Sequence, residues 1–350
     1  MQNSKQYQPH RFPYLWRLAD GYPAKGIEPH GCKVFGTFIC GGGSSMGYKL
    51  AGYHHLGGVE LDPSVAAVYK QNHHPEHLYI EDIRDFNKRT DLPAELYQLD
   101  ILDGSPPCST FSMAGSREKA WGKEKQFSEG QKLQTLDDLV FIYCDTIEKL
   151  KPKVCWLENV AGLVRGNAKI YAKKIVKRLN EIGYNVQVFL LNGATMGVPQ
   201  IRERVFFIGL RKDFHLPKLV LNFNEEPIKF GEIYQGKQKR KPLVGRALER
   251  WESTPPGSNP KTEQGNTFGF LYKTSMQAIA ATVTSSGQMA LPNEPYELTD
   301  DEFKMIGTFP IDYQFANRPA QWFIGMSVAP LMSAQISYQI YKQWLSKINK

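Results

Sequence analysis

The stretch that decides the fold is KVFGTFICGGGSSMGYKLAGYHHLGGVELDP, residues 33–63. It begins with a predicted strand (33–38), and three glycines separate that strand from a short predicted helix (44–52). A second strand (56–61) precedes Asp62 and Pro63, a favourable N-cap and first residue for the next helix. A glycine turn between strand and helix lets a ligand approach the backbone at the helix N-terminus. The stretch therefore predicts an α/β unit, in which the glycines form either a ligand-binding turn or a simple tight turn.

The alternation of strands and helices continues along the chain. Further strands are predicted at 77–82, 96–103, 154–159, 185–192 and 204–210, and helices at 64–72, 136–150 and 172–183. This order indicates an α/β fold, with an open, mostly parallel sheet that has helices on both faces.

Past Lys212 the composition changes. Prolines, glycines and basic residues accumulate, and apolar residues no longer recur at helix or strand spacing. We predict an N-terminal arm over 1–30, a ligand-binding domain over 31–212 and a smaller domain over 213–317. An amphipathic helix is predicted within 327–345, so residues 318–350 are expected to return to the first domain and complete it.

Composition narrows the class of protein. The 350 residues carry a formal net charge of +8 and a pI near 9.0, which permits a polyanionic partner. Five scattered cysteines form no CxxC pair and no metal-ligand spacing, which favours a reducing compartment and no metal. No signal peptide and no apolar run of membrane-spanning length is found. A cytoplasmic protein without a membrane partner is expected.

Two acidic residues end successive predicted strands. Glu60 lies nineteen residues after Gly41, where an acid commonly binds ribose hydroxyls, and Asp82 ends the third strand. Either acid could instead cap a helix. Neither the dinucleotide fingerprint nor the P-loop is present, because Met46 and Tyr48 replace required residues. The pattern favours an adenosine-containing ligand and disfavours a dehydrogenase.

A thiol, a carboxylate and two guanidinium groups are predicted at the same sheet edge. Cys108 follows the fourth strand, Glu158 ends the fifth, and Arg202 and Arg204 precede a later strand. Singly, each has an ordinary structural interpretation: a buried thiol, a helix cap and a basic surface. Together they indicate a catalytic site. The other four cysteines are interpreted as small buried hydrophobic residues.

Six motifs, in this order, resemble the DNA (cytosine-5)-methyltransferase family of bacterial or phage type. They are FICGGGSSMG (38–47), GGVELDP (57–63), EDIRD (81–85), GSPPCSTFS (104–112), WLENV (156–160) and QIRERVFFIG (200–209). The resemblance covers most of 34–210 and, more loosely, 276–335. It implies a Rossmann-like S-adenosylmethionine-dependent methyltransferase fold with a smaller target-recognition domain.

The resemblance also implies a mechanism. Cys108 would attack C6 of a flipped-out cytosine, Glu158 would act at N3, and Arg204, with Arg202 less directly, would stabilise O2. Residues 112–132 would form a lid. The implied contacts with S-adenosylmethionine come from Phe38, Gly41, Gly43, Glu60, Asp82, Ile83, Pro107, Leu139 and Val328. The chain departs from the family's usual residues at Gly36, Cys40, Ser109, Asp137, Asp138 and Met326.

Double-stranded DNA is the implied partner, bound by a monomer associated with the nucleoid. The expected DNA contacts are Ser112, Lys237, Lys239, Arg240 and Lys241. The sequence does not decide whether a cognate restriction endonuclease exists or which DNA sequence is recognised. It also does not decide whether a host or a phage encodes the protein. The alternatives are a tRNA cytosine-5 methyltransferase and a catalytically silent DNA-binding protein of the same fold.

Overall fold

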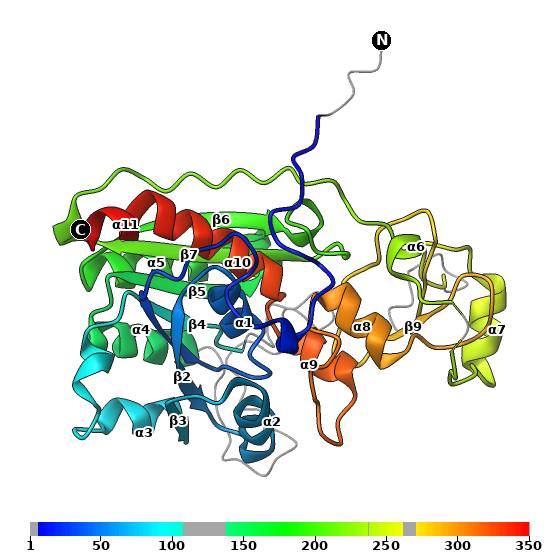
Figure 1. Ribbon diagram of the computed structural model, residues 1–350, viewed down its shortest axis with the longest axis horizontal. Helices are drawn as coiled ribbons and strands as arrows, with labels where there is room; N and C mark the ends of the chain where they lie inside the picture. The colour runs from blue at the N-terminus through cyan, green and yellow to red at the C-terminus, as the bar shows by residue number, and fades with distance from the viewer. Residues whose placement is uncertain (1–5, 108–137, 237, 262–270, 350) are drawn as a thin grey trace.

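A seven-stranded sheet lies at the centre of the larger lobe of the computed structural model, which describes residues 6–107, 138–236, 238–261 and 271–349 (Figure 1). The strands lie in the order β3-β2-β1-β4-β5-β7-β6. Their bounds are β1 Lys33–Thr37, β2 His54–Glu60, β3 His77–Ile80, β4 Ile101–Gly104, β5 Val154–Val160, β6 Tyr184–Asn192 and β7 Glu203–Arg211. Strands β1 to β5 are parallel, and β7 runs antiparallel between β5 and β6.

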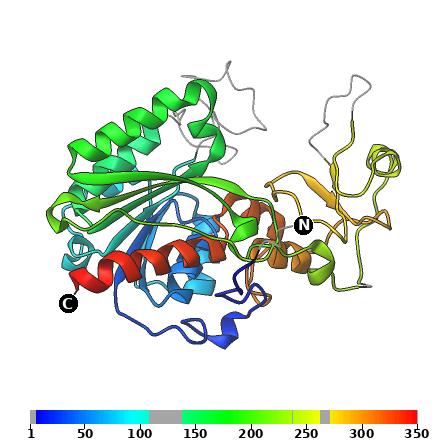
Figure 2. The ribbon, with the colours of Figure 1, turned by 90° about the horizontal axis from the view of Figure 1, so that it is seen from above.

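Helices cover both faces of the sheet (Figure 2). One face packs against α1 (Gly43–Leu50), α2 (Pro63–His73) and α10 (Pro330–Ile340), and the other against α3 (Ile83–Lys88), α4 (Leu139–Leu150) and α5 (Lys169–Glu181). Alternate strand residues separate the two cores, since Val34 belongs to the first and Phe35 to the second. The predicted α/β class, with a mostly parallel sheet and helices on both faces, is confirmed.

Two glycines bring α1 into close contact with the segment that begins α10. A Cβ at Gly43 would lie 2.1 Å from the carbonyl oxygen of Val328, and one at Gly47 would lie 2.3 Å from that of Pro330. Any larger residue at either position would push the two segments apart. The predicted C-terminal helix therefore packs directly on the helix that follows the glycine turn.

The smaller lobe contains α6 (Phe230–Ile233), α7 (Arg246–Ser253), β8 (Leu271–Lys273) and β9 (Gln288–Ala290), while α8 (Asp300–Gly307) and α9 (Ala320–Met326) lie between the lobes (Figure 1). A small separate cluster supports it, formed by Leu243, Leu271 and Ala290 with Trp251 packed against them. Residues of α8 and α9 belong instead to the core beneath α1 and α10. The domain boundaries 30, 212 and 317 stay a prediction.

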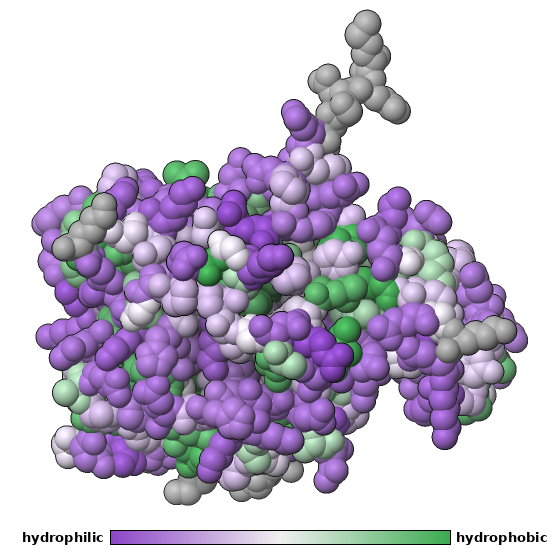
Figure 3. All heavy atoms as spheres, viewed as in Figure 1, coloured by the Kyte–Doolittle hydropathy of each residue, from purple (hydrophilic) through white to green (hydrophobic). Residues whose placement is uncertain are grey.

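The N-terminal segment lies against the larger lobe. Phe12 and Trp16 are buried, and Trp16 Nε1 donates a hydrogen bond to the carbonyl oxygen of Thr308. The chain ends with a π-helical turn over Tyr341–Leu345 and α11 (Ser346–Ile348). The face shown in Figure 3 is mainly hydrophilic. Within the described ranges, no helix combines the length and apolar character needed to cross a membrane.

The fourth strand is shorter than predicted. Residues Ala94–Tyr97 form a 3-10 helix that starts after Pro93, and β4 begins only at Ile101. Proline has no backbone N–H to leave unpaired and is well tolerated at the start of a helical turn, and Pro93 is the N-cap of this one. The predicted strand over 96–103 was therefore wrong in its first half.

Candidate active site

The carboxyl ends of the five parallel strands meet at one edge of the sheet. Glu60 ends β2, and Ser105 follows directly after β4. Because β7 is antiparallel, its first residues lie at the same edge, where Arg204 is the register partner of Val160 on β5. This edge collects the predicted cofactor residues and the predicted catalytic carboxylate and arginine.

The glycine turn at this edge has an unusual backbone. Phe38, Cys40 and Gly42 have positive φ angles of 56°, 46° and 69°. A Cβ at Gly42 would lie 2.1 Å from Nε2 of His73, so only glycine fits there. The turn is therefore held in one conformation by close packing from beneath and by the positive φ that glycine tolerates.

Glu60 fixes this turn from the neighbouring strand. Its Oε2 accepts a hydrogen bond from the backbone N–H of Cys40 at 2.9 Å. Its Oε1 accepts from the N–H groups of Leu61 and Asp62 at 2.9 and 3.0 Å. Burial raises the pKa of Glu60, and the three N–H groups oppose that rise. Because each carboxylate oxygen can accept twice, one acceptor position is left for a ligand hydroxyl, on Oε2.

Asp82 is the N-cap of α3. Its Oδ1 accepts from the backbone N–H of Arg84 at 2.8 Å, and Arg84 Nη1 lies 3.1 Å from its Oδ2. The helix-cap interpretation is thus confirmed for Asp82, while a contact with an adenine amino group stays a prediction. Ile83, the next residue, is buried.

The remaining predicted cofactor residues differ in burial. Phe38 and Pro107 are partly exposed, whereas Leu139 and Val328 are buried in the cores on opposite faces of the sheet. The carbonyl of Val328 lies over Gly43, and a Cβ at Gly41 would lie 2.8 Å from the ring of Phe323. Phe323, on α9, is a neighbour of this site that sequence analysis did not identify.

Glu158 and Arg204 form an ion pair at the end of β5. Arg204 Nε lies 3.1 Å from Glu158 Oε1, and their side chains are 14% and 11% exposed. Burial raises the pKa of Glu158, while the charges of Arg204 and Arg202 lower it. A carboxylic acid with a raised pKa is suited to donate a proton near neutral pH.

Arg202 has a different environment from Arg204. Its guanidinium group is buried and donates to the carbonyl oxygens of Val283, Gly325 and Ser327 at 3.0, 3.0 and 2.6 Å. These bonds join the start of β7 to α9 and to the segment before β9. Among the described residues, Arg204 is the arginine that pairs with the Glu158 carboxylate, and the catalytic role of Arg202 stays a prediction.

The strand end that leads to Cys108 is joined to the Glu158 strand. Asn159 Nδ2 donates to the carbonyl oxygen of Pro106 at 3.2 Å, and a hydrogen bond from Ser105 lowers the pKa of Glu158. Cys108 follows Pro107 directly, but Cys108, Ser112 and the predicted lid lie outside the described residues.

The four other cysteines have the environment expected of unreactive thiols. Cys32, Cys144 and Cys155 are buried, and Cys40 is partly buried. Burial raises the pKa of each thiol. A thiol kept protonated is a poor nucleophile, so none of these four competes with Cys108 for a catalytic role.

A buried carboxyl group beneath the site was not identified from the sequence. Asp103, on β4, is 2% exposed, and its Oδ2 accepts from Ser44 Oγ at 2.7 Å. Burial raises the pKa of Asp103 to about 7, and the Glu158 charge also raises it. The sequence did contain a signal for this group, because Asp103 is an acid inside an otherwise apolar strand, two residues before Ser105.

Among the described residues predicted to contact DNA, one side chain is buried and two residues are exposed. Arg240 forms a buried, two-pronged ion pair with Glu302 on α8, with N–O distances of 2.5 and 2.8 Å and an exposed side-chain fraction of 3%. The guanidinium group of Arg240 thus faces inward, toward Glu302, and its contact with DNA stays a prediction. Lys239 and Lys241 are exposed, and Lys241 pairs with Glu297. Lys237 lies outside the described residues.

Sequence comparison identifies relatives over most of this architecture. Residues 33–342 match the family described as C-5 cytosine-specific DNA methylase. The type II methyltransferase M.FnuDI of Fusobacterium nucleatum is 32% identical over 188 residues, which are 53% of this chain and 48% of that protein. The orphan methyltransferase M.SPRI of Bacillus phage SPR is 31% identical over 168 residues, 48% of this chain and 34% of that protein. The aligned part thus spans about half or less of these relatives.

Solved structures share the fold at lower identity. A prophage-encoded E. coli protein assigned as a DNA modification methyltransferase superposes with a TM-score of 0.68 at 19% identity, over 91% of this chain and 100% of that chain. A Spodoptera frugiperda DNMT2 variant superposes with a TM-score of 0.65 at 16% identity, over 89% and 100%. Both share this chain's arrangement of a mostly parallel sheet between helices.

Proposed function

Because the chain belongs to the C-5 cytosine-specific DNA methylase family, we propose that it methylates carbon 5 of a cytosine within a specific DNA sequence. The observation that best supports this is the buried Glu158–Arg204 pair, joined through Asn159 to the strand end that leads to Cys108. A thiol, a proton donor and a cation at one place are the groups that activation of a cytosine ring needs.

The glycine turn fits S-adenosylmethionine, the methyl donor of this family. Glu60 presents a fixed carboxylate for ribose hydroxyls, and the partly exposed ring of Phe38 offers a flat surface for adenine. The bound cofactor supplies a methyl group on a sulfonium centre. Asp82, Ile83, Pro107, Leu139 and Val328 complete the proposed pocket.

The proposed chemistry uses this chain's own groups on the base. The Cys108 thiolate adds to C6 while Glu158 supplies a proton at N3, so that C5 becomes nucleophilic and accepts the methyl group. The C5 proton then leaves to solvent, the C6–S bond breaks to restore the thiolate, and N3 returns its proton to the Glu158 carboxylate. Arg204 holds Glu158 in place and stabilises charge at O2. The base must leave the duplex, since a stacked cytosine cannot reach these groups.

Recognition of the sequence is proposed to lie in residues 213–317. The exposed Lys239 and Lys241 would contact phosphates, and base edges would be contacted by other residues of the same segment. Exchange of this segment for that of a relative should move the methylated sequence and preserve activity. An active chimera that still methylates the original sequence would place recognition elsewhere.

A covalent trap tests the proposal. A duplex with 5-fluorocytosine at the target should form a stable adduct with the wild-type protein, because fluorine at C5 blocks the final elimination. Peptide mass spectrometry should find the adduct on Cys108, and Cys108→Ala should form none yet still bind the duplex. An adduct on another cysteine, or transfer of labelled methyl groups to tRNA and not to duplex DNA, would refute it.

A further inference from the structure

Asp103 lies between the glycine turn and the Glu158–Arg204 pair. On β4 it is in register with Gly36 on β1 and with Trp156 on β5. Glu158 follows Trp156 by two residues, and side chains two apart on a strand share a face. Asp103 and Glu158 are therefore diagonal neighbours on the face of the sheet that α1 covers.

Asp103 is bonded to both ends of the segment that contains the glycine turn. Its Oδ2 accepts from Ser44 Oγ at 2.7 Å, and Ser44 is the second residue of α1, directly after the glycines. Thr37, the last residue of β1, donates its hydroxyl to the Asp103 carbonyl oxygen at 3.2 Å. A change at Asp103 is therefore felt where the turn begins and where it ends.

The carboxyl group of Asp103 has few donors to stabilise a negative charge. The residue is 2% exposed, and its Oδ1 has no hydrogen-bond partner in the described part of the chain. Glu60, by comparison, accepts from three backbone N–H groups. Burial accordingly raises the pKa of Asp103, and the negative charge of Glu158 raises it further, whereas the hydroxyl groups of Ser44 and Tyr48 lower it.

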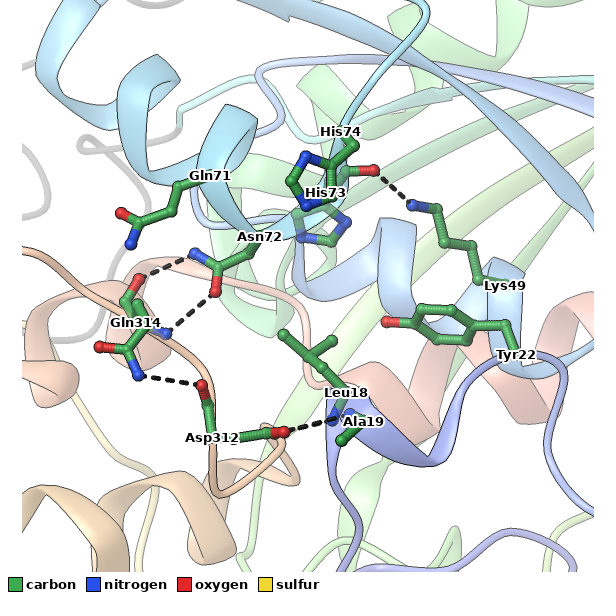
Figure 4. Close-up of a pocket in the computed structure, with 10 residues that line it drawn as sticks. All are labelled: Leu18, Ala19, Tyr22, Lys49, Gln71, Asn72, His73, His74, Asp312 and Gln314. Atoms are coloured by element: carbon green, nitrogen blue, oxygen red, sulfur yellow. Dashed lines mark hydrogen bonds between the residues drawn. The ribbon is translucent and has the colours of Figure 1, made fainter.

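The groups that interact with Asp103 from the surrounding elements are neutral apart from Glu158. They are Ser44 and Tyr48 on α1, Glu158 on β5, Tyr69 on α2 and Tyr143 on α4. Burial raises the pKa of each of these tyrosines, so each keeps its proton. The cation of α1, Lys49, lies at the far end of that helix, where its Nζ donates to the carbonyl oxygen of His73 at 3.1 Å (Figure 4). Among the described residues, the charge that acts on Asp103 is therefore that of Glu158.

The two carboxyl groups titrate as a pair. Burial raises the pKa of Glu158, whereas Arg204, Arg202 and Ser105 lower it. Because like charges repel, whichever carboxyl group ionises first raises the proton affinity of the other. The pair as a whole therefore retains one proton to a higher pH than Glu158 would alone.

We propose that Asp103 and Glu158 share this proton, and that Asp103 is thereby a positioning residue that keeps Glu158 able to donate to cytosine N3. When Asp103 is ionised, its charge holds the proton on Glu158, while its bond to Ser44 holds the start of α1 beside the turn. The proton transfers stay balanced, because Glu158 gives its proton to N3 and recovers it at the end of the cycle. The effect on rate rests on the proposed function, whereas the shared proton does not.

The shared proton is tested on the unliganded full chain by nuclear magnetic resonance of isotope-labelled aspartate carboxyl groups. The Asp103 signal is the one missing from Asp103→Asn, and its midpoint in the wild type is expected at about pH 7. Glu158→Gln removes a negative charge, so the midpoint should fall by about one pH unit. Ser44→Ala removes a donor and should raise it, while Glu203→Gln, at the surface, should leave it unchanged. An equal midpoint in Glu158→Gln and the wild type would overturn the proposal.

The effect on rate is tested by single-turnover methyl transfer at about pH 6 and about pH 8, with saturating DNA and S-adenosylmethionine. Asp103→Asn keeps an acceptor for Ser44 but carries no charge. Its rate should equal that of the wild type at the lower pH, where Asp103 is protonated, and should be about tenfold lower at the higher pH. An equal reduction at both pH values would show a purely structural role and overturn the proposal.

Asp100→Asn is the matched control for the rate. Asp100 is a buried acid directly before β4, where it accepts from the backbone N–H of Lys33 and from Lys153 Nζ. Its variant should show the same rate relative to the wild type at both pH values. Asp103→Ser and Glu158→Ser remove the same charges with smaller side chains, and they replace either amide variant that does not fold.

The proposed function and this inference fail in different ways. A wild type that transfers no methyl group at any pH refutes the proposed function, and the Asp103 midpoint in Glu158→Gln then still decides whether the proton is shared. A wild type that is active, with a rate ratio to Asp103→Asn that does not change with pH, refutes the inference alone.

Discussion

Arg204 Nε lies 3.1 Å from Glu158 Oε1, across the antiparallel pair of β5 and β7. The contact is diagonal, because Arg204 is in register with Val160 while Glu158 is in register with Phe206. The reversed direction of β7 is what brings an arginine from the start of one strand to the end of another. The ion pair with Arg204 fixes the direction of the Glu158 carboxyl group, on which the proposed chemistry depends.

Replacement of Glu158 by glutamine should lower the rate of methyl transfer by about 10²–10⁴-fold, because proton donation is lost. Affinity for S-adenosylmethionine should be unchanged, as the carboxylate acts on the base. Single-turnover transfer of labelled methyl groups measures the rate, and calorimetry measures the affinity. Glu203→Gln is the matched control, since Glu203 precedes Arg204 in the sequence and pairs with Arg165 at the surface. A normal rate in Glu158→Gln would contradict the assignment.

Replacement of Glu60 by alanine should have the opposite effect. The turn loses its bond to the Cys40 N–H and the ligand loses its carboxylate, so cofactor binding should weaken by about 1–3 kcal/mol. The methyl-transfer rate at saturating cofactor should change much less. Titration calorimetry with S-adenosylmethionine checks this, and a variant with normal cofactor affinity would show that Glu60 serves only the backbone.

Asp103 should make stability depend on pH. Its pKa is raised from 3.8 to about 7, so the folded protein keeps a proton that the unfolded chain releases. The free energy of unfolding should therefore fall as the pH rises from about 4 to about 7, by at most about 4 kcal/mol. Asp103→Asn should remove this fall, as shown by urea denaturation at about pH 5 and about pH 8. Identical pH dependence in the two proteins would exclude Asp103 as the cause.

Two basic residues of the smaller lobe should have different roles, one in stability and the other in DNA binding. Arg240→Met leaves Glu302 buried and unpaired, so it should lower the free energy of unfolding by about 3–5 kcal/mol. Lys239→Met should not alter stability but should weaken binding to all duplexes and reduce the salt slope by about one. Urea denaturation and duplex titration at several salt concentrations measure the two effects. Weakened duplex binding with unchanged stability in Arg240→Met would show instead that Arg240 contacts DNA.

Strand positions were predictable because alternating and apolar runs depend on local sequence, but strand direction was harder. The runs at 185–192 and 204–210 both form strands, yet a general prediction of a mostly parallel sheet did not identify β7 as the reversed one. The sequence did contain a signal for an antiparallel pair, because the ten residues between β6 and β7 are too few for the crossover that parallel strands need. Connection length would have given the direction.

Side-chain partners distant in sequence were not predictable. Arg240 belonged to a basic run, and only folding brings Glu302, 62 residues later, against it. Arg202 and Arg204 were expected to act together because they are two apart in an extended segment. The three carbonyls that bind Arg202 come from segments more than 80 residues away, which no local pattern reveals.

The close packing of Gly43 and Gly47 against Val328 and Pro330 has a consequence for biosynthesis. The glycine turn is translated long before the segment that packs against it. Until a ribosome has made that segment, the face of α1 that α10 will cover has no permanent neighbour and is available to chaperones. The close packing of the turn is therefore completed only after translation of residues 327–334, and any binding that depends on this packing must follow it.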